Sequence, residues 1–200
     1  MKPIHLTYVM CVFLFLRLVV MLFRQRINKD FRRSLNEVID CVIKTGIWVI
    51  LLMAFVVRTY YIPSESMCPT LQINDHIFVS KVPYYFSSPD RGDVIVFYPP
   101  HRHEEKGVTF IKRVVALEND VVQVSDGVLY VNGTPMSEPY IKELIFNDYP
   151  AYKVPPGHLF VMGDNRNNSD DSRYWGPLPK RDVVGRAFLI FWPFNRFAKI

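Results

Sequence analysis

Apolar residues are distributed along the chain in two different ways, and the change falls near residue 62. Residues 4–23 form a run of 20 mostly apolar residues in which Arg17 is the one formal charge. A helix of about 20 apolar residues spans the hydrocarbon core of a bilayer. A second run, Ile47–Val57, has 11 residues and extends to 41–62 if the basic residues near its ends reach the interface. The pattern therefore predicts two membrane-spanning helices, at about 4–23 and 41–62.

The connector between the two runs, residues 24–40, is basic, with Arg24, Arg26, Lys29, Arg32 and Arg33. The positive-inside rule places such a connector in the cytoplasm. Both termini and everything after the second run are then extracytoplasmic, which divides the chain into a membrane anchor (1–62) and an outer body (63–200). Two other interpretations stay open: a cleaved secretory signal for the first run, and a buried core helix for the second.

The outer body has short apolar runs separated by turn residues, which is typical of strands. The strand-like runs are 77–81, 93–98, 110–115, 121–124, 128–131, 159–162 and 183–192. Asp126-Gly127 between two of these runs predicts a hairpin. We therefore predict a mainly β fold, an antiparallel sheet, in which the polar and proline-rich segment 134–158 forms loops or a small extension.

Composition and charge change this picture little. The 200 residues suit one domain with an extension. The net charge of +5 lies wholly in residues 1–44, and residues 45–200 are neutral, so the basic balance does not favour nucleic acid as a partner. Of the three cysteines, Cys11, Cys41 and Cys68, only the last lies in the outer body. That body therefore has no internal disulfide, and the spacing disfavours a zinc site.

One histidine-rich segment resembles a metal site. It is His101-Arg-His103-Glu-Glu105, which follows two prolines and is highly charged. We interpret it as a solvated loop, and the chain has no glycine-rich phosphate loop. The sequence therefore predicts neither a metal nor an organic cofactor.

Three segments carry candidate chemistry. Ile62–Leu71 holds Ser64 and Ser66 between prolines just after the predicted membrane exit, and taken alone it is an ordinary polar turn. Phe110–Val115 is a strand pattern with adjacent Lys112 and Arg113. Alternation turns these two cations to opposite faces, so one points inward, unless the strand lies at a sheet edge.

A lysine buried in such a strand has a lowered pKa, and its neutral amine can take a proton from a serine hydroxyl. The third segment, Gly163–Gly176, is dense in Asp, Asn, Arg and Ser. It is either a structured polar loop or a scaffold that holds other groups in place.

Together these segments resemble bacterial type I signal peptidases, the membrane-bound Ser/Lys endopeptidases that remove secretory signal peptides. Pro63–Leu71 matches the family run Pro-Ser-x-Ser-Met-x-Pro-Thr-Leu, and Lys112-Arg113 matches its Lys-Arg strand. Gly163–Gly176 matches the run Gly-Asp-Asn-Arg-x-x-Ser-x-Asp-Ser-Arg-x-x-Gly, and Asn74–Lys81 resembles a further strand motif. The resemblance covers nearly the whole chain, and the order of the motifs agrees.

The resemblance implies roles for individual residues. Ser66 is implied to be the nucleophile and Lys112 the general base. The Ser64 hydroxyl and the Ser66 backbone N–H are implied to form the oxyanion hole. The implied supporting residues are Ser169, which orients the amine, and Asp171 and Arg173, which pair and brace their loop.

Three positions depart from the family pattern. Ala116-Leu-Glu-Asn-Asp120 stands where a Gly-x-Pro-Gly-Asp turn is common, and Asn119 can adopt a left-handed conformation more easily than Ala116. Asn74 stands where glycine is frequent. Glu65 stands where a small residue is common, which can alter the approach of substrate to Ser66.

The resemblance implies a serine endopeptidase that cuts exported preproteins after small-x-small sequences, without metal, cofactor or nucleic acid. It implies a multi-pass protein of the bacterial cytoplasmic membrane, with the catalytic domain on the outer or periplasmic face. The alternatives are a relative with one dedicated substrate, a thylakoid relative, and a membrane-tethered β domain that binds a partner without catalysis. The aromatic segment 188–197 is either a core strand with a packed tail or an additional contact with the lipid bilayer.

Overall fold

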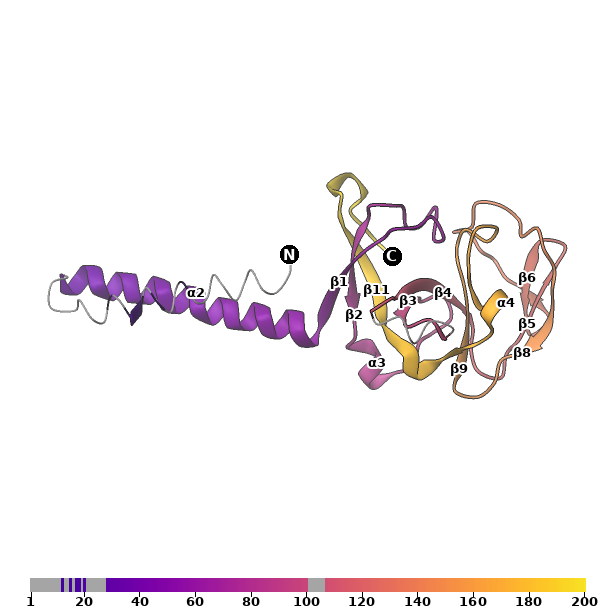
Figure 1. The fold of residues 1–200 in the computed structure, drawn as a ribbon, viewed down its shortest axis with the longest axis horizontal. Helices are drawn as coiled ribbons and strands as arrows, with labels where there is room; N and C mark the ends of the chain where they lie inside the picture. The colour runs from indigo at the N-terminus through magenta and orange to yellow at the C-terminus, as the bar shows by residue number, and fades with distance from the viewer. Residues whose placement is uncertain (1–11, 13–14, 16, 19, 21–27, 101–106) are drawn as a thin grey trace. The chain divides into compact units, whose positions relative to one another are not determined.

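The computed structural model describes residues 12, 15, 17, 18, 20, 28–100 and 107–200. The expected first span and the segment His101–Glu105 therefore lie mostly or wholly outside the described residues. The chain divides into two compact units, Met1–Val57 and Arg58–Ile200, which we describe separately. The elements (Figure 1) are α2 (Lys29–Phe55), β1 (Val57–Tyr61), β2 (His76–Ser80), α3 (Pro83–Phe86), β3 (Val94–Phe97), β4 (Phe110–Ala116), β5 (Val121–Ser125), β6 (Val128–Val131), β7 (Thr134–Pro135), β8 (Tyr149–Lys153), β9 (His158–Met162), α4 (Ser172–Trp175), β10 (Leu178–Pro179), η2 (Lys180–Asp182), β11 (Val183–Trp192), η3 (Phe194–Arg196) and β12 (Ala198–Lys199).

The first unit is dominated by α2. Ile39 and Ile43, one turn apart on this helix, are buried and pack with Val20. Arg17 pairs with Asp40 at 2.7 Å. Among the described residues, none of the helices has both the length and the apolar character that a membrane span requires.

The helix ends earlier than the second apolar run predicts. It stops at Phe55, and Val57–Tyr61 forms strand β1 instead of the end of a span reaching residue 62. Thr59 and the two following tyrosines are β-branched or aromatic and therefore favour a strand.

The main sheet of the second unit has the strand order β1-β2-β11-β3-β4-β9-β10, with β12 added beside β11 (Figure 1). The pairs β2–β11, β11–β3, β3–β4, β4–β9 and β9–β10 are antiparallel. The predicted mainly β, antiparallel fold is confirmed.

A smaller sheet has the order β7-β6-β5-β8. Its β5–β6 hairpin is the predicted one, because Asp126 (φ 50°) and Gly127 (φ 78°) are both left-handed, as a two-residue hairpin turn of this kind requires. The segment 134–158, expected to form loops or a small extension, contributes β7 and β8 to this smaller sheet. Two tyrosines of β8 hold it in place by packing against Phe160, with ring centroids 5.4 and 6.2 Å away.

Strand β4 lies in the middle of the core. Val114 and Val115, neighbours in the strand, are almost completely buried in two different hydrophobic clusters. Because successive side chains point to opposite faces, β4 has apolar groups packed on both of its faces.

Three asparagines adopt left-handed backbone conformations at turns, Asn74 with φ 73°, Asn119 with φ 70° and Asn132 with φ 53°. The Asn119 backbone N–H donates to the Val154 carbonyl at 2.8 Å, which fixes the turn after β4. Ala116 ends β4 as an ordinary strand residue. The expectation that Asn119 can supply the left-handed position is therefore confirmed.

This turn gives a stability prediction. Asn119→Ala should lower the free energy of unfolding of the Arg58–Ile200 unit by about 1 kcal/mol, because an alanine Cβ is strained at positive φ, whereas Asn119→Gly should stay within about 0.5 kcal/mol of wild type. Urea denaturation followed by tryptophan fluorescence measures both. Equal stabilities of the two variants would show that the turn does not depend on the left-handed conformation.

Candidate active site

The serine loop, Pro63–Leu71, joins β1 to β2 and carries Ser64 and Ser66. Met67 and Leu71 are fully buried in the core, and the Leu71 N–H donates to the Met67 carbonyl at 2.9 Å. Ser66, next to this anchor, is half-buried. The apolar residues after Ser66 therefore fix its backbone and leave its hydroxyl near the surface.

Strand β4 holds Lys112 and Arg113 between β3 and β9, so the interpretation of an edge strand is wrong. Lys112 is opposite Ile95 in the register, and Arg113 is opposite Val94. Their exposed fractions are 4% and 9%, so both cations are buried, on opposite faces of the sheet.

The Lys112 amine meets the Ser66 hydroxyl. Nζ lies 2.9 Å from Ser66 Oγ and donates to the Ile111 carbonyl, also at 2.9 Å. Burial lowers the pKa of Lys112 to about 8, although the carboxylates of Asp171, Asp170 and Asp164 act in the opposite direction. An amine with this pKa loses its charge near neutral pH and can then accept the proton of a serine hydroxyl.

Ser64 adds a second hydroxyl. Its Oγ is 3.4 Å from Ser66 Oγ, and the residue is exposed. If Ser66 Oγ bonds to the carbonyl carbon of a substrate, a hydroxyl in this position can donate a hydrogen bond to the oxygen on that carbon.

Arg113 ties three segments of the site together. Its Nε and Nη2 donate to the two Asp164 carboxylate oxygens at 2.8 and 2.7 Å. Thr70 of the serine loop donates to the same carboxylate, and Arg113 also donates to the Gly92 carbonyl at 2.8 Å. One buried ion pair therefore connects β4, the serine loop and the polar loop, Gly163–Gly176.

The polar loop also binds the serine loop directly. The Asn165 backbone N–H donates to the Ser66 carbonyl at 3.1 Å, and its side-chain amide donates to the Glu65 carbonyl at 3.2 Å. Both contacts act on the backbone beside the Ser66 hydroxyl, so they restrict its position.

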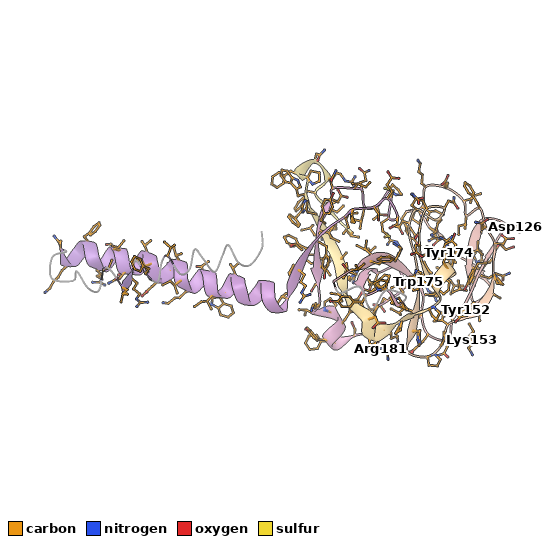
Figure 2. All side chains as sticks on the ribbon, in the orientation of Figure 1. Asp126, Tyr152, Lys153, Tyr174, Trp175 and Arg181 are labelled. Atoms are coloured by element: carbon orange, nitrogen blue, oxygen red, sulfur yellow. The ribbon has the colours of Figure 1, made fainter. Side chains whose placement is uncertain are left out.

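Asp171 organises the end of the polar loop. It is completely buried, pairs with Arg173 through two 2.9 Å hydrogen bonds, and accepts the Gly163 N–H at 3.1 Å. It also caps α4, from which Tyr174 and Trp175 project (Figure 2). The side chain of Trp175 packs near Phe97, with ring centroids 5.9 Å apart.

A further ion pair was not predicted from the sequence. The Arg166 guanidinium is completely buried and donates to both Glu138 oxygens at 2.6 Å, and Tyr140 donates to the same carboxylate at 2.8 Å. Arg166 lies within the polar-loop motif, and a buried arginine requires a carboxylate partner. The spacing could not identify that partner, because Glu138 is 28 positions away in a segment expected to form loops or a small extension.

Ser169 makes no contact of the kind that the resemblance implies. Its buried Oγ has no hydrogen-bond partner among the described residues, and the Lys112 amine donates to Ile111 instead. Ser169 nevertheless lies close to the serine loop. A Cβ built on Gly163 would overlap both Ser169 Oγ and the Ser66 carbonyl oxygen, so glycine is required between them.

A cleft of about 420 Å³ lies in front of the Ser66 hydroxyl. It is lined by Pro63–Ser66, Val108–Lys112, Asn168 and Asp170. One part of its lining is apolar, and Glu65 and Asp170 contribute carboxylates. In the described part of the chain, no three His, Cys, Asp or Glu side chains are grouped as metal ligands would be.

A serine hydroxyl at hydrogen-bond distance from a buried amine, beside an open cleft, has the arrangement of a serine hydrolase in which lysine takes the place of histidine. Comparison with known proteins agrees with this class. Residues 35–192 match the family described as "Signal peptidase, peptidase S26".

The curated relatives carry similar names. The chain is 43% identical over 170 residues to "Probable signal peptidase I-1" of Synechocystis sp., covering 83% of this chain and 87% of that protein. It is 43% identical over 166 residues to "Signal peptidase I" of Leptolyngbya laminosa, covering 79% and 82%. It is 43% identical over 143 residues to "Probable thylakoidal processing peptidase 2, chloroplastic" of Arabidopsis thaliana, covering 70% of this chain and 39% of that protein.

The chain therefore belongs to the peptidase S26 family of signal peptidases. The predicted family is confirmed, and so is the predicted enzyme class, a serine endopeptidase that hydrolyses peptide bonds.

The Arg166–Glu138 pair gives a second stability prediction. Glu138→Gln should lower the free energy of unfolding by about 3 kcal/mol, because it leaves the buried Arg166 charge without a counter-ion. The matched control is Glu143→Gln, an exposed position nearby, which should change it by less than about 0.5 kcal/mol. Chemical denaturation of the Arg58–Ile200 unit measures both, and equal effects would contradict the assigned role of the pair.

Proposed function

We propose that this protein is a membrane-bound serine endopeptidase that removes N-terminal signal peptides from exported preproteins. Ser66 is the nucleophile, and Lys112 is the general base. The observation that carries the proposal is the 2.9 Å distance between Lys112 Nζ and Ser66 Oγ, with the amine buried. Relatives named signal peptidase I support the substrate class.

In the acylation step, the uncharged Lys112 amine takes the Ser66 proton as Oγ attacks the carbonyl carbon of the scissile bond. The carbonyl oxygen becomes an oxyanion, and the Ser64 hydroxyl and the Ser66 backbone N–H donate to it. Lys112 then gives its proton to the departing amine. The C–N bond breaks, and the signal peptide stays on Ser66 as an ester.

In the deacylation step, water replaces the released amine. Lys112, neutral again, takes a proton from this water as it attacks the ester carbon. The protonated amine then returns the proton to Ser66 Oγ as the C–O bond breaks. Each half of the reaction thus uses the same amine first as a base and then as an acid.

We assign Asp171 and Arg173 a bracing role, because their buried pair holds the Gly163 backbone that adjoins the serine loop. We assign Ser169 the role of orienting the amine when substrate is bound. Its hydroxyl is buried close to Gly163 and has no hydrogen-bond partner among the described residues. It is therefore available to accept a hydrogen bond from the Lys112 amine.

The cleft supports a preference for small side chains on the acyl side of the bond. Val108, Phe110 and Ile111 line it beside the Ser66 hydroxyl. An apolar wall of this kind favours small apolar side chains. A small-x-small cleavage sequence presents two such side chains to the cleft.

Membrane attachment is also part of the proposal. The apolar run at 4–23 and the apolar part of α2 from residue 41 to Phe55, with the basic connector 24–40, favour a multi-pass anchor in the bacterial cytoplasmic membrane, with the outer body 63–200 on the outer face. Exposed aromatic residues at the C-terminal end of the body support further contact with lipid. Their exposed fractions are 46% for Trp192, 75% for Phe194 and 62% for Phe197.

Two narrower alternatives share this chemistry. One is an enzyme for a single dedicated substrate, which a panel of several preproteins would distinguish. The other is a thylakoid enzyme, which the relative named as a thylakoidal processing peptidase keeps open.

The proposal predicts that two single changes abolish cleavage. Ser66→Ala removes the nucleophile, and Lys112→Met removes the base while keeping an unbranched chain in the buried site. Each should reduce processing of a preprotein by the detergent-solubilised protein by a factor of about 10³ or more. Lys112→Arg should also be inactive, because a guanidinium stays protonated.

Lys153→Met, at an exposed position on β8, is the matched control and should cleave at the wild-type rate. Thermal unfolding establishes that each variant is folded. Wild-type processing by a folded Ser66→Ala protein would eliminate the assignment of Ser66 as the nucleophile, whereas absence of processing by the folded wild-type protein would favour a binding domain without catalysis.

The pKa of Lys112 predicts the pH dependence. Since burial lowers this pKa to about 8 and only the uncharged amine is a base, kcat/KM should reach a plateau above about pH 8 and fall about tenfold per pH unit below it. Asp170→Asn removes a negative charge that raises this pKa, so it should shift the fall to lower pH. Peptide cleavage measured across the pH range tests both predictions. An unshifted pH profile of Asp170→Asn would show that the Asp170 charge does not affect the pKa of Lys112.

A further inference from the structure

A second pocket, of about 240 Å³, lies away from the serine loop, where α3 follows the end of β2 and meets the start of β11 (Figure 1). It is lined by Lys81, Tyr84, Tyr85, Tyr98, Val183 and Val184. Lys81 is the last residue of the Asn74–Lys81 motif, and the cleavage mechanism has no use for it.

Among the described residues, the pocket contains a positive charge without an acidic partner. Lys81 is half-buried and has no carboxylate within ion-pair distance among the described residues. Burial lowers its pKa, and the nearby Arg58 of β1 lowers it further. Arg58 likewise has no acidic partner in the described part of the chain. Two cations that repel one another beside a pocket attract an anion.

Two of the acidic groups near the pocket are already matched by cations, and a third, Asp90, lies near Tyr84. Asp93 accepts from the Tyr84 hydroxyl at 2.9 Å and pairs with Arg186 at 3.0 Å. Asp182, which precedes the β11 lining, lies 3.9 Å from Arg181. Among the described residues beside the pocket, Lys81 and Arg58 are therefore two cations without an acidic partner.

The remaining lining specifies the shape and polarity of the ligand. Tyr85 and Tyr98 are 68% and 41% exposed, and tyrosine hydroxyls donate hydrogen bonds to anionic oxygens. Val183 and Val184 supply an apolar wall. Cations, hydroxyl donors and an apolar wall together suit a phosphate group attached to an apolar body.

We propose that this pocket binds the phosphate group of an anionic phospholipid, with Lys81 and Arg58 as its charged ligands. Arg58 follows the end of α2 at Phe55 by three residues, a reach of about 10 Å at most. If α2 carries the proposed membrane span, the pocket lies within reach of lipid headgroups. The choice of a lipid as the source of the phosphate rests on the proposed membrane attachment. The affinity of the pocket for a phosphate group does not depend on that attachment.

Bound lipid would add a specific contact between the peptidase unit and the membrane surface. Such a contact restricts the rotation of the unit about the short connection after α2. The cleft would then be held at one height and orientation relative to a substrate that is itself anchored in the bilayer.

The experiment uses the full chain in a nonionic detergent, titrated with dihexanoyl phosphatidylglycerol below its micellar concentration and followed by calorimetry. Wild type should bind it saturably and more weakly as salt is raised. Lys81→Gln and Arg58→Gln should each weaken binding about tenfold. Lys153→Gln, on β8 of the smaller sheet (Figure 2), is the charge-matched control and should bind like wild type. Thermal unfolding confirms that the variants are folded.

Two further arms identify the source of the phosphate. Inorganic phosphate should bind at least tenfold more weakly than the lipid. If it binds equally well and competes with the lipid, the ligand of the pocket is a soluble phosphate and not a lipid. Dihexanoyl phosphatidylcholine should bind more weakly because its choline is repelled. Absence of saturable binding, or equal losses in Lys153→Gln and Lys81→Gln, would overturn the site. Because binding is measured without cleavage, failure of the Ser66 and Lys112 assignments leaves this test unaffected.

Discussion

The site depends on placing an amine where it is poorly solvated. Lys112 occupies a central strand whose faces are both covered, so its charged form loses hydration and gains no adjacent carboxylate contact. Its nearest partners are a hydroxyl and a backbone carbonyl. The next residue, Arg113, points to the opposite face of the sheet, and its charge is stabilised by a bidentate hydrogen-bonded ion pair with Asp164. One strand thus holds a lysine that can lose its proton beside an arginine that cannot.

Two of the three carboxylates that act on Lys112 are balanced by arginines. Asp164 pairs with Arg113, and Asp171 pairs with Arg173. Buried ion pairs contribute little net stability, because desolvation offsets the attraction. Their value here is positional: they fix the polar loop against the serine loop, and the pairing limits how far each carboxylate can raise the pKa of the amine.

The sequence predicted the class of fold and the hairpin at Asp126-Gly127, because alternation and turn chemistry are local. It also indicated Ser66 and Lys112 as the chemical groups, although their proximity, across 46 positions, is a tertiary property. Strand β8 was missed because its residues pack on Phe160 of another sheet, which no local pattern reports. Glu138 was missed for the same reason, since a counter-ion is selected by the fold and not by its spacing from Arg166. The alternative of an edge strand for β4 is wrong because β3 and β9 pair with its two edges and both cations are buried, and neither neighbour is visible in the local pattern of β4.

The position of β11 has a consequence for the order of assembly. This C-terminal strand lies between β2 and β3, so the two halves of the main sheet have no direct ladder with each other until it is inserted. Before β11 is inserted, the side-chain and loop contacts of Arg113, Asp164, Thr70 and Asn165 can join the serine loop to β4, but the sheet hydrogen bonds between β2 and β3 through β11 are missing. The main sheet is therefore complete only after Val183–Trp192 has been added to it.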